Sequence, residues 1–159
     1  TVRFLTQMKE YGLLGKLQIV GASGTVTSQN ITAIGDAAEG YVTGVGYSPL
    51  IDSPENKAFV EKFRASAKAD PDLYGADSYG LLYFYKAAAE KAGAVGTAKL
   101  RTAMEGIEWP TPQGKKVMRA ADHQAMQTMY AVQVQGGKFA IQSTIPADKA
   151  IGPSTCNKW

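Results

Sequence analysis

The sequence predicts an α/β fold, and three observations lead to this class. In the first third of the chain, segments with helical spacing of apolar residues alternate with short apolar segments in the order helix, strand, helix, strand. Two strong helical patterns follow in the middle of the chain. Near the end, alternating residues on both sides of Gly136-Gly137 predict a β-hairpin.

Four elements are predicted before residue 50. The apolar residues of segment 2–8 recur every three positions and predict an amphipathic helix. Segment 17–20 is a short apolar run, which we interpret as a buried strand, and it leads into the glycine-rich loop 21–25. A short helix over 30–34 and an alternating strand over 41–47 complete this part of the chain.

The middle of the chain is helical. Ser53 and the proline after it supply an N-cap and a first helical residue for a helix that extends to about residue 68. The strongest helical pattern covers residues 77–92 and is followed by Gly93. Because its apolar residues lie on most sides of the helix, we expect this helix to be buried. A further helix over 100–107 ends before two prolines that cannot continue it.

The composition is that of one globular domain. A chain of 159 residues with 45% apolar residues can form a core without disulfides or metals. Seventeen basic and 14 acidic residues give a net charge of +3, and the densest basic group is Lys115, Lys116 and Arg119. This group is smaller than the basic stripe with aromatic platforms that nucleic-acid binding requires, so we expect no nucleic-acid partner.

Residues suited to catalysis or metal binding are few. His123 has no Ser or Cys nucleophile motif near it, and Gly-x-Ser-x-Gly is absent. Segment 112–116 is similar to the end of a phosphate loop, but Trp109 stands where the first glycine is required. One His and one Cys cannot form a zinc site without carboxylates, and no acidic residues have EF-hand spacing. We therefore expect no catalytic residues, no metal and no cofactor.

The remaining chemistry is that of binding a small molecule. The glycine-rich loop after segment 17–20 exposes backbone N–H groups, and Ser23 and Thr25 add hydroxyls, so this loop can hold an anionic group. An ordinary strand-to-helix turn is the alternative. Tyr74 precedes the predicted helix 77–92, where its ring can face a cleft instead of the core.

The order and spacing of these segments resemble the periplasmic substrate-binding proteins of ABC importers, of the leucine/isoleucine/valine-binding type. The likeness runs over nearly the whole chain. The segments that carry it are, in order, Leu17-Gln18-Ile19-Val20-Gly21, Ala22-Ser23-Gly24, Ala37-Ala38-Glu39-Gly40, 56–63, Asp70-Pro71, Tyr79, 87–93, Thr111-x-x-Gly114, Asp122-His123-Gln124 and Gly137-Lys138-Phe139.

The resemblance implies a type I periplasmic-binding-protein fold, in which two Rossmann-like lobes close on a ligand about a hinge in the manner of a Venus flytrap. This chain corresponds only to the carboxyl-terminal half of that fold. Residues 1–47 match the later part of the second lobe, and residues 48–122 match the returning part of the first lobe. Residues 123–145 match a hairpin of the second lobe, and 146–159 form a carboxyl-terminal tail.

The function implied by the resemblance is that of the extracytoplasmic solute-binding component of an ABC importer. Such a protein carries a signal peptide, is periplasmic or lipid-anchored, and delivers its ligand to a membrane permease. The expected ligand is an amino acid of the branched-chain type or a related small aliphatic or aromatic carboxylate. The expected partners are the permease and the missing amino-terminal half. A ligand-sensing domain of a receptor or regulator with the same fold is the alternative.

The resemblance also assigns candidate ligand-binding residues. Amino-acid binders of this family commonly have an acidic residue in the loop formed here by Gly21, Ala22 and Ser23, and Ser23 occupies its position. Tyr74 corresponds to an aromatic residue that packs on the ligand side chain, and Asp77 is the candidate to replace the acidic residue. For an exported parent protein, we expect Cys156 to be oxidised to a cysteine of the missing half.

Overall fold

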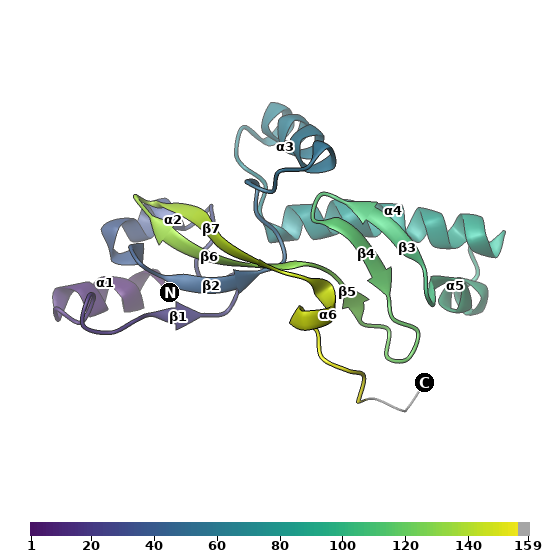
Figure 1. The fold of residues 1–159 in the computed structure, drawn as a ribbon. Helices are drawn as coiled ribbons and strands as arrows, with labels where there is room; N and C mark the ends of the chain where they lie inside the picture. The colour runs from purple at the N-terminus through teal and green to yellow at the C-terminus, as the bar shows by residue number, and fades with distance from the viewer. Residues whose placement is uncertain (156–159) are drawn as a thin grey trace.

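The computed structural model describes residues 1–155, which form two units that lie side by side (Figure 1). We call them the four-stranded unit and the three-stranded unit after their sheets. The four-stranded unit contains α1 (Val2–Glu10), β1 (Val20–Gly21), α2 (Ile31–Ile34), η1 (Gly35–Ala38), β2 (Val42–Val45), β6 (Met129–Gln135) and β7 (Lys138–Ile145). The three-stranded unit contains α3 (Pro54–Ala67), α4 (Leu73–Ala92), α5 (Thr97–Met104), β3 (Glu108–Thr111), β4 (Gly114–Met118) and β5 (Ala125–Met126), and α6 (Ala147–Ala150) follows β7.

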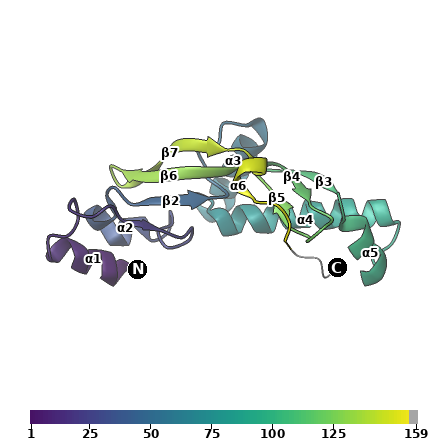
Figure 2. The same cartoon turned by 60° about the horizontal axis from the view of Figure 1, so that its bottom comes forward.

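The larger sheet has the strand order β1-β2-β6-β7. Strands β1 and β2 are parallel, with Val20 opposite Val42, whereas β2 pairs antiparallel with β6. Strands β6 and β7 form the predicted hairpin, and Gly136 and Gly137 both have positive φ in its turn, at 58° and 73°. Helices α1 and α2 lie on one face of this sheet (Figure 2). The predicted α/β class and hairpin are confirmed.

The core of the four-stranded unit lies between this sheet and its helices. Leu5 of α1 is 2% exposed, and it packs with Ile31 and Ile34 of α2, Tyr41 before β2, and Val134 of β6. These residues come from both ends of the chain, so residues 1–50 and the hairpin fold as one unit. This core fixes the position of the loop that follows β1.

The three-stranded unit is built on α4. Its sheet has the order β3-β4-β5, and the core cluster contains Phe84 of α4, Leu100 of α5, and Trp109 of β3. The rings of Phe84 and Trp109 lie 4.4 Å apart between centroids. The sequence analysis did not anticipate this sheet because two prolines stand in its first hairpin. Pro110 is tolerated in β3 because β3 is an edge strand, where a missing N–H removes no bond to a second neighbour.

Helices α3 and α4 begin at side-chain caps. The Ser53 hydroxyl accepts a hydrogen bond from the Asn56 N–H at 3.1 Å, as its sequence position predicts. The Asp72 carboxylate accepts from the Gly75 N–H at 2.9 Å, so α4 begins at Leu73 instead of residue 77. Tyr74 is therefore a residue of the first turn of α4, and its predicted place outside the helix is wrong.

The expectation that α4 is buried on most sides is also wrong for the described residues. Its buried residues follow one stripe with a spacing of four, namely Ala76, Gly80, Phe84 and Ala88. On other sides Leu81 and Leu82 are 60% and 72% exposed. The pattern of apolar residues was identified correctly, but within residues 1–155 the sheet covers only one face of the helix.

The strand predicted over 17–20 is short and lies at a sheet edge. Only Val20 and Gly21 pair with β2, and Val20 is 67% exposed because β1 has one neighbouring strand. Leu17 is 53% exposed. The strand is therefore not buried in this part of the chain, although Ile19 packs against the core.

An ion pair fixes the segment after α6. Arg119 donates hydrogen bonds to both carboxylate oxygens of Asp122, at 2.8 and 2.6 Å, and to the Gly152 carbonyl at 2.7 Å. The hydrogen bonds from Arg119 lower the pKa of Asp122 from 3.8 to about 2. The Asp122 carboxyl group therefore has a lower pKa in the folded state than in the unfolded state.

We expect the contribution of Asp122 to stability to be fully present above about pH 5, to decrease as the pH falls through the unfolded pKa of 3.8, and to be lost as the pH falls through the folded pKa of about 2. Urea unfolding of the wild type and Asp122→Asn at pH 6 and pH 2.5 measures it. The stability difference between the two proteins should be clear at pH 6 and should shrink at pH 2.5. An equal difference at both pH values contradicts the prediction.

Among the described residues, no helix is both long and apolar enough to cross a membrane. Cys156 lies outside the described residues, so its expected disulfide stays a prediction.

Candidate functional site

The loop after β1 is held by hydrogen bonds on both sides. The Tyr41 hydroxyl donates to the Ala22 carbonyl at 3.3 Å, and the Thr25 N–H donates to the same carbonyl at 3.2 Å. Asn30, next to α2, donates from its side chain to the Thr25 carbonyl at 3.1 Å. Gly24 has φ +86°, a value that favours glycine. The loop therefore has one defined backbone conformation that presents Ser23, which is exposed.

Tyr74 lies against this loop. A Cβ atom added to Gly24 would be only 2.9 Å from the Tyr74 hydroxyl, so the phenol touches the loop backbone. Tyr74 comes from the three-stranded unit and is 61% exposed. The structure thus places Tyr74 beside the loop that contains Gly21, Ala22 and Ser23, so four of the candidate residues lie in one region.

Asp77, the fifth candidate residue, is already paired. Its carboxylate accepts hydrogen bonds from Gln113 at 2.6 Å and from the Lys116 ammonium at 2.8 Å. The Lys116 side chain is 9% exposed, whereas that of Asp77 is 49% exposed. This contact joins α4 to the β3–β4 hairpin. A ligand ammonium would have to share the Asp77 carboxylate with Lys116, and the binding role of Asp77 stays a prediction.

A groove that the sequence analysis did not identify runs between the two units. Its volume is about 460 Å³, and residues from both units line it. The four-stranded unit contributes Gly24 and Val26 from the loop side and Lys138 from the hairpin. The three-stranded unit contributes Arg64 and the segment 70–73 before Tyr74. We call it the inter-unit groove. Gly24 and Leu73 line it, but the predicted site residues Gly21, Ala22, Ser23, Tyr74 and Asp77 are not among its lining residues.

The described residues contain no site for the catalysis or metal binding that the sequence analysis considered. His123 has φ 56° and its ring nitrogen lies 3.1 Å from a Glu105 carboxylate oxygen, as in a turn held by a side-chain contact. Within residues 1–155, no group of three His, Cys, Asp or Glu side chains is arranged to hold a metal ion. The inter-unit groove is therefore the strongest candidate site.

Comparison with protein families gives a match over most of the chain. The model of a family described as "Periplasmic binding protein" matches residues 1–138. A curated relative from Brucella suis biovar 1 (strain 1330), named Leu/Ile/Val-binding protein homolog 6, is 28% identical over 138 residues. That alignment covers 84% of this chain and 35% of the relative, so the chain spans about a third of the relative's length.

Solved structures have the same fold. A solute-binding protein of an ABC transporter from R. palustris, in complex with benzoate, matches with a TM-score of 0.80 at 26% identity, over 96% of this chain and 42% of that chain. An ABC-type branched-chain amino acid transporter from Rhodopseudomonas palustris CGA009 matches with a TM-score of 0.72 at 25% identity, over 90% of this chain and 40% of that chain.

Proposed function

This chain belongs to the periplasmic binding protein family, and from that premise we propose that it is the carboxyl-terminal half of an extracytoplasmic solute-binding protein. The complete protein would hold a small ligand between two lobes and deliver it to the membrane permease of an ABC importer. The transporter names of the matched proteins favour import over the ligand-sensing alternative. The expectation of no catalytic residues agrees with a protein that binds its ligand without converting it.

Two exposed surfaces of the described residues support the proposal that the complete protein has another half. The exposed face of α4 carries Tyr74, Leu81, Leu82 and Tyr85, which are 61%, 60%, 72% and 46% exposed. Strand β1 is a sheet edge with unpaired backbone groups, and Val20 beside it is 67% exposed. Large exposed apolar patches mark interaction surfaces. The remaining residues of the same protein are the occupant that we propose for both surfaces.

The observation that carries the proposal is the contact of Tyr74 with the loop after β1. It joins the two units next to Gly24 and Leu73, which line the inter-unit groove, so a ligand that extends from the groove to Ser23 and Tyr74 would touch both units. The loop offers backbone N–H groups and a neutral Ser23 hydroxyl, and Tyr74 offers an aromatic surface. We propose that the ligand is an amino acid of the branched-chain type or a small aromatic carboxylate.

The Ser23 position separates these two ligand classes. A hydroxyl cannot form the charge-assisted bond that a carboxylate makes with an ammonium, which contributes about 1.5–3 kcal/mol. We expect the complete protein to bind 4-methylpentanoate and 3-phenylpropanoate more tightly than leucine and phenylalanine. Ser23→Glu should reverse this order by about 10-fold or more, as calorimetry can measure.

Ser23→Gln is the matched control, because it has the size of Glu without the charge and should leave the wild-type order unchanged. Tight binding of leucine by the wild type would show that another acidic residue holds the ammonium. The absence of saturable binding of every amino acid and carboxylate tested would reject the proposed function itself.

A further inference from the structure

The chain returns to the three-stranded unit after β7. Within residues 1–155, segments 46–53 and 127–128 connect the two units, and segment 146–155 then forms a third connection. This last segment contains α6 and reaches the turn 119–124 between β4 and β5. Figures 1 and 2 both show α6 beside β5. We call residues 146–155 the strap and residues 119–124 the β4–β5 turn.

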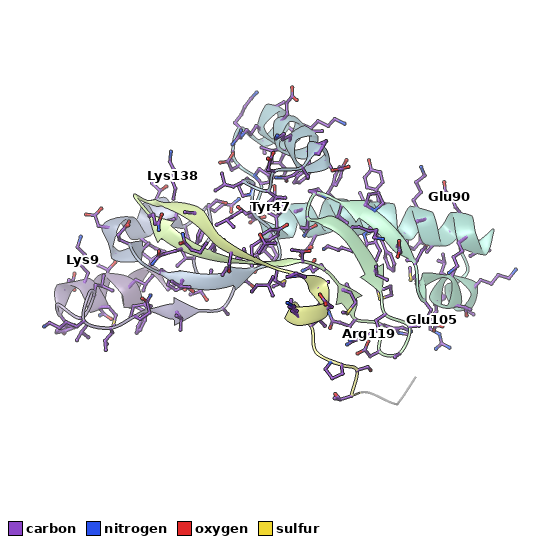
Figure 3. All side chains as sticks on the ribbon, viewed as in Figure 1. Lys9, Tyr47, Glu90, Glu105, Arg119 and Lys138 are labelled. Atoms are coloured by element: carbon purple, nitrogen blue, oxygen red, sulfur yellow. The ribbon has the colours of Figure 1, made fainter. Side chains whose placement is uncertain are left out.

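One guanidinium fastens the strap to the β4–β5 turn. The Nη1 of Arg119 donates to the Gly152 carbonyl at 2.7 Å, and its Nε and Nη2 donate to the Asp122 carboxylate at 2.8 and 2.6 Å. The Ser154 hydroxyl donates to the same carboxylate. Figure 3 shows Arg119 beside the strap. Two residues of the strap are therefore bonded to two charged residues of the turn, and such charge-assisted bonds are roughly twice as strong as neutral ones. We call this set of bonds the latch.

Partial burial makes the latch different from an exposed ion pair. The side chains of Arg119 and Asp122 are only 22% and 13% exposed. Exposed pairs contribute little because water competes for both charges and the side chains remain mobile. Here the two bonds to Asp122 fix the plane of the guanidinium, which directs Nη1 at the Gly152 carbonyl. A lysine cannot reproduce this arrangement, because its ammonium lacks the planar fork.

Both ends of the strap are attached to hydrogen-bonded structure. In the turn, the Arg119 N–H donates to the Gln124 carbonyl at 2.9 Å, and the His123 ring lies 3.1 Å from the carboxylate of Glu105, which follows α5. At its other end the strap continues from β7, which pairs with β6. A rotation that moves the β4–β5 turn away from β7 must therefore extend the strap or break the latch.

The other two connections lie together and form one pivot. Gly46 and Gln127 belong to segments 46–53 and 127–128, and a Cβ atom added to Gly46 would collide with the Gln127 side chain. Two connections in direct contact permit the units to rotate about them, as hinge segments do. The strap is attached elsewhere, at the β4–β5 turn, so it opposes that rotation. The arrangement that it holds is the one in which Tyr74 touches the loop after β1 at Gly24.

We propose that Arg119 is a positioning residue for the candidate ligand site, because it fastens the strap that holds the two units in this arrangement. This inference rests on the proposed function, since it concerns how the same site is kept assembled. When a binding-competent arrangement is only partly populated, the apparent affinity falls by that fraction. The strap keeps the arrangement populated before the ligand arrives. Releasing the strap lets the units separate, so a bound ligand is lost faster.

Two variants of the complete protein release the strap in different ways. Arg119→Ala removes the latch. Insertion of Gly-Ser-Gly-Ser between Ile145 and Pro146 keeps every contact of the latch but lengthens the strap by up to about 13 Å. Glu105→Gln is the matched control, because it changes the contact of the β4–β5 turn with the end of α5 and leaves the latch and the strap unaltered.

Small-angle X-ray scattering without ligand measures the arrangement of the units. Both strap variants should have a larger radius of gyration than the wild type, and Glu105→Gln should not. Stopped-flow binding then uses whichever of leucine, phenylalanine, 4-methylpentanoate and 3-phenylpropanoate the wild type binds most tightly. Both strap variants should bind this compound about 10-fold more weakly, mainly through faster dissociation, whereas the association rate changes little.

Contrary results separate the role of the strap from the proposed function. A wild-type radius of gyration in the insertion variant overturns the inference, whether or not any ligand binds. Wild-type affinity in that variant also overturns it, even when Arg119→Ala binds weakly, since Arg119 would then act only on the turn. Equal losses in Glu105→Gln would assign the effect to the turn as well. If no amino acid or carboxylate binds to the wild type, the proposed function is rejected, and scattering alone decides the role of the strap.

Discussion

Replacing Gly21 by alanine is expected to destabilise the complete protein by about 3 kcal/mol or more. An added Cβ atom would lie 3.0 and 3.2 Å from ring carbons of Tyr41 and would collide with its hydroxyl. Tyr41 is 2% exposed within the core of the four-stranded unit, so its ring has no space to move. Overpacking of this kind typically costs about 1–3 kcal/mol. The displaced hydroxyl would also lose its bond to the Ala22 carbonyl, worth about 1 kcal/mol.

Urea unfolding measures this change, and Gly44→Ala is its matched control. Gly44 lies in β2 of the same sheet, and a Cβ atom added there meets no heavy atom within 4 Å. We expect the control to change the free energy of unfolding by about 0.5 kcal/mol or less. Combining Gly21→Ala with Tyr41→Leu should restore part of the lost stability. Equal effects of Gly21→Ala and Gly44→Ala would show that the close contact with Tyr41 does not constrain the loop.

The same contact explains why the loop after β1 suits a binding site. Gly21 lets the Tyr41 ring reach the loop backbone, and the Tyr41 hydroxyl then fixes the Ala22 carbonyl one residue before Ser23. Ser23 is exposed on a backbone that packing holds rigid. A ligand that binds here meets a preformed surface, so it does not have to order the loop.

Local chemistry made much of the fold predictable from the sequence. The Ser53 cap and the proline after it placed the start of α3, and Gly136-Gly137 placed the hairpin turn. Both signals act within a few residues of chain. The resemblance added the loop after β1 and Tyr74 as candidate ligand-binding residues, and the structure brings them into contact through Gly24.

What the sequence could not reveal depends on contacts between distant residues. Asp77 and Lys116 are 39 positions apart, and nothing in either segment indicates that they pair. The groove beside Tyr47 exists only because segments near residues 26, 47, 70 and 138 converge. The sequence also did not indicate which face of α4 is buried, because the apolar residues of α4 lie on several sides and tertiary packing covers only one of them.

The pairing of Asp77 with Lys116 leads to the second large expected effect. Asp77→Ala should destabilise the complete protein by about 2–3 kcal/mol, because it leaves a lysine side chain that is 9% exposed without its counter-ion. The full penalty of about 3–5 kcal/mol for breaking a buried pair is not expected, since the Asp77 side is 49% exposed and water can enter. Gln113 would also lose its acceptor.

Lys116→Met separates the charge from the packing. This variant removes the buried ammonium and keeps the apolar stem. Because water can hydrate the remaining carboxylate of Asp77, Lys116→Met should lose less stability than Asp77→Ala in urea unfolding. Lys115→Ala is the control. Lys115 and Glu108 form an exposed ion pair, with side chains 65% and 55% exposed, and we expect this pair to contribute about 0–1 kcal/mol.

If Lys116→Met proves as damaging as Asp77→Ala, the uncompensated ammonium is not the cause of the loss. If Lys116→Met instead tightens leucine binding, the freed Asp77 carboxylate is available to a ligand ammonium, as the resemblance suggests for this residue.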